Sequence, residues 1–313
     1  MELKEKQRKE TQILCIGEPL IIKATDKEFV FRHLNEKEIS QFKFALESYF
    51  VKDAIKINPY ENEIIDSKKK GVGTYLKLDK DKFRYSCLEY KGDNELNSII
   101  DNVFYLTSIE PRIIGRLVYL NNDMGGLCFN EVNTSIYYSE MKFFDNSIVK
   151  EINDEFIKEF KLILNAYIEL SDEYSFVIKS IQDFKEICLM PNTSHFKIIG
   201  YFSVVENLLT SGTDKSIRSE LGNKINLLNN RFEVPLEWNS YFKGSNTTSL
   251  KTIIENAYKY RNDIAHGNEI DFDKKLRSLN NNIQVRLFLH DLTKKLLVYS
   301  LNEPQLIKDL KNC

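Results

Sequence analysis

The sequence predicts an α+β protein, with a mixed, mostly β N-terminal domain over residues 1–145 and an all-helical bundle over residues 146–313. Two observations predict this class. Before residue 145, short apolar runs alternate with turn residues, as they do in β-strands. After residue 145, apolar side chains recur at the helical period of about 3.6 residues. The length of 313 residues is enough for two domains that each bury a core.

The N-terminal part contains strand-like stretches and one clear helix. The apolar residues Ile39, Phe42 and Phe44 recur at helical spacing and predict a helix over 36–51. Segment 95–106 fits a helix or a strand equally well. The strand-like stretches are 13–16, 20–22, 29–31, 74–78, 83–90, 113–119, 126–129 and, more weakly, 134–138.

The pattern changes at Ser147, which we expect to cap a helix that continues through Ile148, Ile152 and Phe156. Pro191 and Gly244 fall between later helical patterns, where helix stops belong. The bundle is therefore expected to contain about six helices. The five later patterns cover 174–189, 196–210, 215–229, 249–266 and 274–300.

Charge gives little support to general binding of nucleic acid. The chain carries 44 Lys and Arg against 46 Asp and Glu, a net charge of -2, so no global positive field exists. The balance is uneven, because residues 191–313 hold 17 basic and 13 acidic side chains. Any contact with a polyanion is therefore expected in the C-terminal part.

The first residues, the short apolar runs and the cysteines predict a cytoplasmic protein with no membrane partner. The first ten residues are dense in charge and lack the apolar core of a signal peptide, and no apolar run is long enough to span a bilayer. The five cysteines are far apart and include no Cys-x-x-Cys pair, which argues against a disulfide framework and a zinc site. We therefore expect no metal and no cofactor.

The segment most informative about chemistry is Tyr-Lys-Tyr-Arg-Asn-Asp-Ile-Ala-His-Gly at residues 258–267. An apolar stripe precedes it, so we expect it at the end of an amphipathic helix that Gly267 terminates. His266 then lies in the last turn, where the helix dipole favours the imidazolium form. Asn262 and His266 share one helix face, whereas Arg261 and His266 lie about 140° apart. The arginine must therefore wrap round, or the helix must deform.

These residue types can cleave RNA. Arginine grips a phosphate with two parallel donors, and histidine accepts or donates a proton. The ribose 2′-hydroxyl is a built-in nucleophile, so the reaction requires no metal ion. One histidine per chain supplies only one proton-transfer group, whereas this reaction works best with both an acid and a base. Two copies in a symmetric dimer would supply the pair.

Residues 261–267 resemble the Arg-polar-x-x-x-His motif of the HEPN superfamily, all-helical ribonuclease domains of prokaryotic toxins and antiviral defence. Segments 196–209 and 216–230 resemble the first and middle helices of its Apea-like branch, so the resemblance covers about residues 195–300. It implies that Arg261, Asn262 and His266 line an RNA-cleaving site at a homodimer interface, with Glu206 and Asp263 in support. It also implies a partner that is not identified, an antitoxin or a phage-derived trigger. The N-terminal domain would then either sense the trigger or select the substrate.

Plainer interpretations stay open for each feature. Arg261 and His266 could be a surface arginine and a helix-capping histidine, and Glu206 either pairs with Arg261 or lies on an exposed helix face. The protein as a whole could be a non-catalytic binding module, such as an antitoxin, adaptor or sensor. It could also be an interaction protein that acts through its N-terminal domain.

Other candidate residues favour structural roles. We expect His195 to cap a helix and His290 to pack on the last long helix, while His33 has no residues near it in the sequence that suggest chemistry. Segment 68–73 is expected to be a turn rather than a phosphate-binding loop. Trp238 and nearby aromatic residues are expected to pack against the bundle rather than stack on RNA bases.

Overall fold

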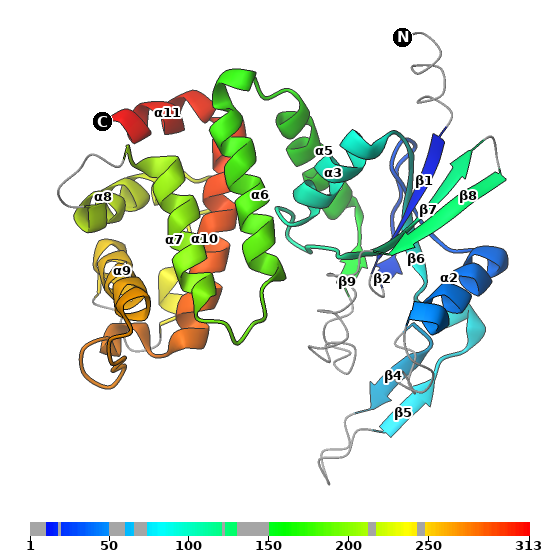
Figure 1. Cartoon of the computed structure of the whole chain (residues 1–313), viewed down its shortest axis with the longest axis horizontal. Helices are drawn as coiled ribbons and strands as arrows, with labels where there is room; N and C mark the ends of the chain where they lie inside the picture. The colour runs from blue at the N-terminus through cyan, green and yellow to red at the C-terminus, as the bar shows by residue number, and fades with distance from the viewer. Residues whose placement is uncertain are drawn as a thin grey trace. The chain divides into compact units, whose positions relative to one another are not determined.

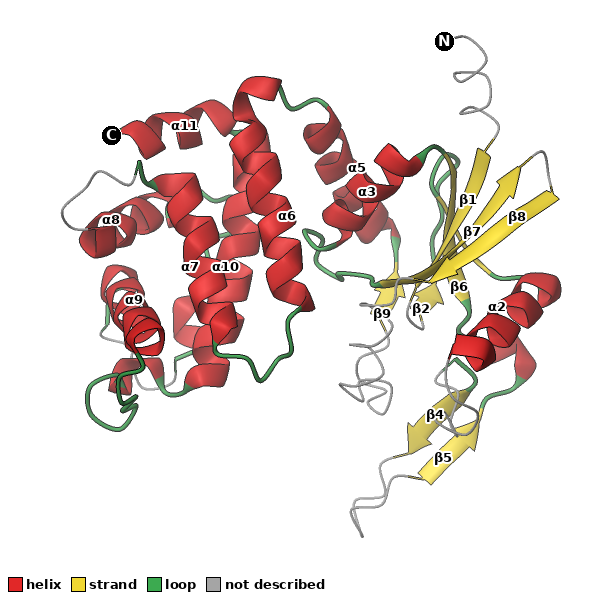
Figure 2. Ribbon diagram, in the orientation of Figure 1, coloured by secondary structure: helices red, strands yellow, loops and turns green. Residues whose placement is uncertain are grey.

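The computed structural model describes residues 11–17, 20–49, 60–65, 74–120, 123–129, 150–211, 217–242 and 248–313 (Figure 1). It contains both helices and strands, the mixed class that the sequence predicts (Figure 2). Two compact units divide the chain, an N-terminal unit over Met1–Leu164 and a C-terminal unit over Asn165–Cys313. The boundary expected at 145/146 lies outside the described residues.

The N-terminal unit is built on a five-stranded antiparallel sheet. Ile13 lies opposite Tyr90 on one neighbouring strand and Val118 on the other, and its side chain is buried. In spatial order the strands are β3 (Val30–His33), β6 (Ser86–Lys91), β1 (Thr11–Gly17), β7 (Ile113–Leu120) and β8 (Asp123–Phe129).

Helices cover both faces of this sheet. Successive strand residues point to opposite sides, so the strands offer apolar side chains to a helix on each face. Phe31 faces α5 (Asp154–Ile168), where it makes edge contacts with Phe156 and Phe160 at ring-centroid distances of 5.7 and 6.0 Å. Helix α3 (Asn94–Phe104) adds Phe104 to the same cluster. These aromatic contacts explain why most of α5 belongs to the N-terminal unit.

The opposite face packs against α2 (Glu36–Tyr49), which confirms the predicted first helix. The fully buried ring of Phe42 lies edge-on to Tyr60 and Tyr85, with centroids 5.5 and 6.2 Å away. Two smaller pairings complete the unit. They are the parallel β2 (Leu20–Ile22) with β9 (Lys150–Ile152) and the antiparallel β4 (Asn62–Ile65) with β5 (Thr74–Lys77).

The predicted helix start near Ser147 is wrong. Ile152 is fully buried in β9, where it pairs with Ile22, and α5 begins only at Asp154. The Asn153 side chain caps that helix by accepting a hydrogen bond from the Phe156 N–H at 2.9 Å. The apolar spacing predicted the wrong start because Ile152, a strand residue, lies at helical spacing from Phe156 in α5. Ser147 itself, like segments 68–73 and 134–138, lies outside the described residues.

Segment 95–106, which the pattern left undecided, is mostly helix α3. The Asp93 carboxylate accepts hydrogen bonds from the N–H groups of Glu95 and Leu96 and so caps its start. This side-chain cap marks a helix start, which the apolar pattern alone does not distinguish from a strand.

The described part of the C-terminal unit contains helices and connecting turns (Figure 2). Helix α7 lies centrally and packs against α6, α9 and α10. The predicted last helix begins later than expected, because the Asn281 side chain caps it by accepting from the Gln284 N–H. Following the end of α5, the helices are α6 (Ser175–Leu189), α7 (Phe196–Leu209), α8 (Ile217–Asn229), α9 (Leu250–His266), α10 (Asn282–Asn302) and α11 (Pro304–Asn312).

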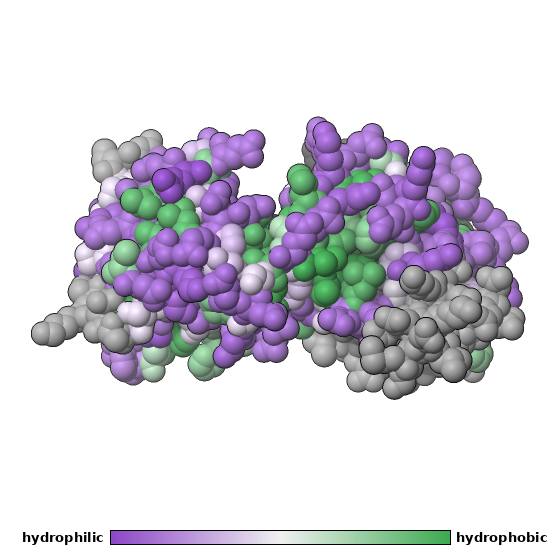
Figure 3. All heavy atoms as spheres, turned by 90° about the horizontal axis from the view of Figure 1, so that it is seen from above, coloured by the Kyte–Doolittle hydropathy of each residue, from purple (hydrophilic) through white to green (hydrophobic). Residues whose placement is uncertain are grey.

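A helix needs about 20 predominantly apolar residues to cross a bilayer. None of the described helices combines that length with that apolar character. Figure 3 shows mainly polar side chains over the visible surface of the C-terminal unit, with small apolar patches between them.

Candidate functional site

Helix α9 carries the Arg-Asn-x-x-x-His segment without a break. Ser249 caps its start by accepting a hydrogen bond from the Thr252 N–H. Gly267 ends it in the left-handed conformation, with φ of 66°, and its N–H bonds to the carbonyls of the preceding turn. His266 therefore occupies the last turn, as the sequence predicts.

Arg261 is held on three sides. Its Nη1 donates to Oδ1 of Asn262 at 3.0 Å, and its Nη2 lies 3.7 Å from Oε1 of Glu206 on α7. The guanidinium carbon sits 5.4 Å from the centre of the Tyr258 ring, a cation–π distance. The Arg261 and Glu206 side chains are 23% and 22% exposed, so the pair is only partly hydrated.

Tyr258 links Arg261 to helix α7. Its ring meets Phe202 edge-on, with centroids 5.2 Å apart. Burial raises the pKa of Tyr258. The negative charge of Glu206 and a hydrogen bond between the Tyr258 hydroxyl and the Glu206 carboxylate raise it further, whereas the positive charge of Arg261 acts in the opposite direction. Sequence reasoning missed Tyr258, although its position three residues before Arg261 places both on neighbouring points of the helix surface.

Two polar atoms in this cluster lack hydrogen-bond partners. Nε of Arg261 and Oε1 of Glu206 are both buried, and neither forms a hydrogen bond in the described structure. An unpaired buried donor is energetically costly, so it is a ready partner for an incoming acceptor. Arg261 therefore keeps an unused N–H donor, the kind of group from which an oxyanion accepts a hydrogen bond.

His266 is not part of that cluster within one chain. Its side chain is exposed, and within the described residues it forms no hydrogen bond or ion pair. Because α9 is regular from Leu250 to His266, Arg261 and His266 stay about 140° apart round the helix axis. Asn262 shares the outward face with His266 instead.

Asp263 supports the end of α9. Its carboxylate accepts a hydrogen bond from the Asn268 side chain at 3.1 Å, and its carbonyl accepts from the Asn268 N–H at 2.8 Å. These bonds hold the chain as it leaves the helix directly after His266.

The expected capping role of His195 is wrong. It precedes α7, but its side chain makes no capping hydrogen bond. Instead its Nδ1 lies 3.2 Å from the Tyr260 hydroxyl, which donates to Oδ1 of Asn282 at 2.9 Å. Burial raises the pKa of Tyr260 to about 12. Sequence spacing gave no signal for this contact between distant segments.

His290 has a packing role, as the sequence predicts, and Trp238 is held by a hydrogen bond. The His290 ring lies against Phe184 and Tyr201, and its Nδ1 bonds to Asp291 at 2.8 Å. Burial acts to raise the pKa of Asp291, but hydrogen bonds from His290 and Tyr241 outweigh it and lower that pKa. The Trp238 indole N–H donates to the Thr248 carbonyl at 3.3 Å.

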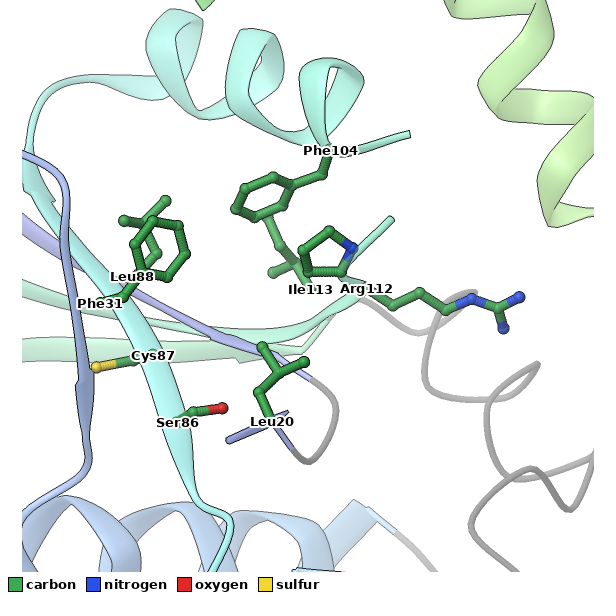
Figure 4. A pocket seen from close by; sticks show the side chains of 9 residues that line it. Leu20, Phe31, Ser86, Cys87, Leu88, Phe104, Arg112 and Ile113 are labelled. Atoms are coloured by element: carbon green, nitrogen blue, oxygen red, sulfur yellow. The ribbon is translucent and has the colours of Figure 1, made fainter. Parts of the chain in front are cut away.

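A small pocket in the N-terminal unit is a weaker candidate site. Figure 4 shows the Arg112 side chain pointing away from the mostly apolar side chains round it, so no charged group projects into the space. The pocket is lined by Leu20, Phe31, Ser86, Cys87, Leu88, Phe104, Pro111, Arg112 and Ile113.

Among the described residues, no group of three His, Cys, Asp or Glu side chains is arranged to hold a metal ion.

Comparison with protein-family models, curated proteins and solved structures finds no match to the chain. Function is therefore inferred from the residues of the Arg261 cluster and from their positions.

Proposed function

We propose that the chain is a metal-independent endoribonuclease of the HEPN type, Apea-like branch, which acts in the cytoplasm in phage defence or a toxin system. The observation that carries this proposal is the position of Asn262. It accepts a hydrogen bond from Arg261 and shares the outward face of α9 with His266. The N-terminal unit senses the trigger or selects the RNA.

Arg261 binds the scissile phosphate, and Nε supplies a donor that has no hydrogen-bond partner among the described residues. The ribose 2′-hydroxyl attacks phosphorus, so its oxygen forms a new P–O bond while the bond to the 5′-oxygen breaks. One basic group takes the 2′-hydroxyl proton, and one acidic group gives a proton to the leaving 5′-oxygen. The products are a 2′,3′-cyclic phosphate and a 5′-hydroxyl. His266 performs one of the two proton transfers.

A homodimer accounts for the second proton transfer and for the separation of Arg261 and His266. The two side chains diverge on a regular helix, so they do not converge in one chain. The exposed His266 is free to meet a second copy, which brings two histidines to a composite site. One histidine then acts as base while the other acts as acid.

The test compares His266→Ala with His33→Ala, another exposed histidine that lies in the N-terminal unit. Loss of a proton-transfer group lowers the rate by about 10²- to 10⁴-fold, so we expect that loss of RNA cleavage for His266→Ala alone. Cleavage is measured on radiolabelled RNA, with and without EDTA. Unchanged cleavage by His266→Ala contradicts the site, and abolition by EDTA contradicts metal independence.

One observation favours a second candidate, a non-catalytic binding module. Arg261 already contacts Asn262 and Glu206, as a purely structural arginine would. The two functions are separated by overexpressing the parent and Arg261→Ala proteins in cells. Toxicity that Arg261→Ala relieves supports the ribonuclease, whereas purified protein that binds RNA without cutting it supports the binding module.

A further inference from the structure

The contact between Arg261 and Glu206 is a loose one. A charge-assisted hydrogen bond between a guanidinium and a carboxylate spans about 2.7–2.9 Å, whereas Nη2 of Arg261 and Oε1 of Glu206 are 3.7 Å apart. Both residues also keep one buried polar atom that forms no hydrogen bond within the described part of the chain, Nε on Arg261 and Oε1 on Glu206. The two charges attract each other, yet their hydrogen-bonding capacity is not used up.

The rest of the Arg261 side chain is fixed more firmly. Asn262 accepts the hydrogen bond from Nη1, and the Tyr258 ring lies against the guanidinium carbon at 5.4 Å. The edge formed by Nε and Nη2 is therefore the edge with unused donors. A phosphodiester carries two non-bridging oxygens that match two parallel N–H donors of arginine.

The Glu206 carboxylate lies at this same edge, because its Oε1 is 3.7 Å from Nη2 of Arg261. Two anions so close to one guanidinium repel each other, because their charges are only partly screened at a site that is about one quarter exposed. A phosphate therefore has to displace the carboxylate or bind against its repulsion.

We propose that Glu206 is an internal competitor for the phosphate-binding edge of Arg261, and that it holds the arginine in a resting state until an RNA phosphodiester displaces it. The identity of the displacing ligand rests on the proposed function, whereas the competition itself rests on the Arg261–Glu206 contact. Glu206 acts through Arg261 and is a positioning residue, not a catalytic one.

Glu206→Gln tests the competition, because it removes the charge and keeps the shape of the side chain. The matched control is Glu255→Gln, which removes a charge from α9 at a side chain that is also 22% exposed and lies 3.9 Å from Lys251. Two probes are titrated by calorimetry against the full-length proteins. These are inorganic phosphate and a 2′-deoxy oligonucleotide, which lacks the attacking hydroxyl and is not cleaved.

We expect Glu206→Gln to bind both probes about three- to tenfold more tightly, and Glu255→Gln to bind them as the parent does. With cleavable RNA, the same variant lowers KM and leaves kcat within about twofold, a split that a merely structural role would not produce. Melting temperatures of the variants confirm that each is folded.

Unchanged or weaker probe binding by Glu206→Gln overturns the competition. Equal tightening by Glu255→Gln overturns it too, because the effect then comes from net charge. Neither titration requires RNA cleavage. Tighter binding by Glu206→Gln in a protein that cuts no RNA therefore leaves the competition standing and rejects only the ribonuclease.

Discussion

Each unit of the molecule contains an arginine beside a glutamate, and the two pairs differ in how completely they are hydrogen-bonded. In the N-terminal unit, Nη1 and Nη2 of Arg32 each donate to Glu38 at 2.8 Å, and its Nε donates to Glu89. In the C-terminal unit, Arg261 and Glu206 approach only to 3.7 Å. All three nitrogens of the Arg32 guanidinium donate hydrogen bonds, whereas Nε of Arg261 has no hydrogen-bond partner in the residues that the structure describes.

Arg32 and its two glutamate partners, Glu38 and Glu89, join three elements of the N-terminal unit. Arg32 lies on β3, Glu38 on α2 and Glu89 on β6, and the Asn35 N–H adds a further hydrogen bond to Glu38 at 2.8 Å. Glu38 is 4% exposed, so its charge depends on these partners. Such a pair fixes a helix on a sheet and has no capacity left for a ligand.

The unsaturated pair has the opposite properties. It is partly exposed, its contact is loose and each partner has an unused polar atom. Loose, partly exposed ion pairs contribute little to stability. The comparison therefore predicts that variants of Arg261 change function and variants of the Arg32 pair change stability.

Arg261→Ala is expected to give the largest effect. It removes the donors that bind the phosphate, and loss of such a donor lowers catalysis by about 10²- to 10³-fold. Its free energy of unfolding should change by less than about 2 kcal/mol, because the ion pair with Glu206 is loose and the hydrogen bond to Asn262 and the cation–π contact with Tyr258 are each weak. Cleavage rate and urea unfolding measure the two quantities. Arg286→Ala, which removes a half-buried arginine from α10, serves as the control. A large loss of stability with Arg261→Ala would make the residue structural and break the comparison.

Glu38→Gln is expected to destabilise the fold by about 2 kcal/mol at pH 7, since it weakens a buried, fully bonded ion pair. Burial acts to raise the pKa of Glu38, but the hydrogen bonds from Arg32 and the Asn35 N–H outweigh it and lower that pKa. A lowered pKa in the folded state stabilises the protein above the unfolded-state pKa of about 4.3, and this stabilisation disappears as pH falls through the folded value. Urea unfolding of parent and variant at pH 7 and pH 3 should therefore show the difference shrinking in acid. A constant difference would contradict the role of the Glu38 charge.

Hydrogen exchange locates the same effect within the molecule. The peptides that contain β3 and β6 should lose protection in Glu38→Gln, because Arg32 and Glu89 lie on these strands. The α9 peptide should exchange as in the parent. Faster exchange in α9 alone would contradict the assignment of this pair to the N-terminal unit.

Local patterns were sufficient for much of the fold. Gly267 ends α9 as expected, because a residue without a side chain adopts the left-handed conformation at low cost. The start of α5 was missed because Ile152 fits a helical period and is buried as a strand residue instead. Apolar spacing reports burial, and it does not report which backbone partner produces the burial.

The candidate site was predictable to the extent that it lies on one helix. Their spacing singles out Arg261, Asn262 and His266 as candidates. For Glu206 two interpretations were open, a partner of Arg261 or a residue of an exposed helix face, and the 3.7 Å contact favours the first. The contact of His195 with Tyr260 was not predictable, because it joins residues 65 positions apart in the chain. Tertiary packing determines such contacts, and spacing within one segment contains no information about them.

The smallest expected effect concerns the ring beneath Arg261. Tyr258→Leu removes the aromatic face that lies 5.4 Å from the guanidinium carbon, and a partly exposed cation–π contact contributes about 0.5–1 kcal/mol. RNA cleavage, measured as kcat/KM, should therefore fall about two- to fivefold. Tyr258→Phe keeps the face and should stay within about twofold of the parent. The Arg32 pair has no role in this measurement, so Glu38→Gln should leave kcat/KM unchanged at a temperature where it is folded. If Tyr258→Phe falls as far as Tyr258→Leu, the hydroxyl beside Glu206 positions Arg261, and the aromatic face does not.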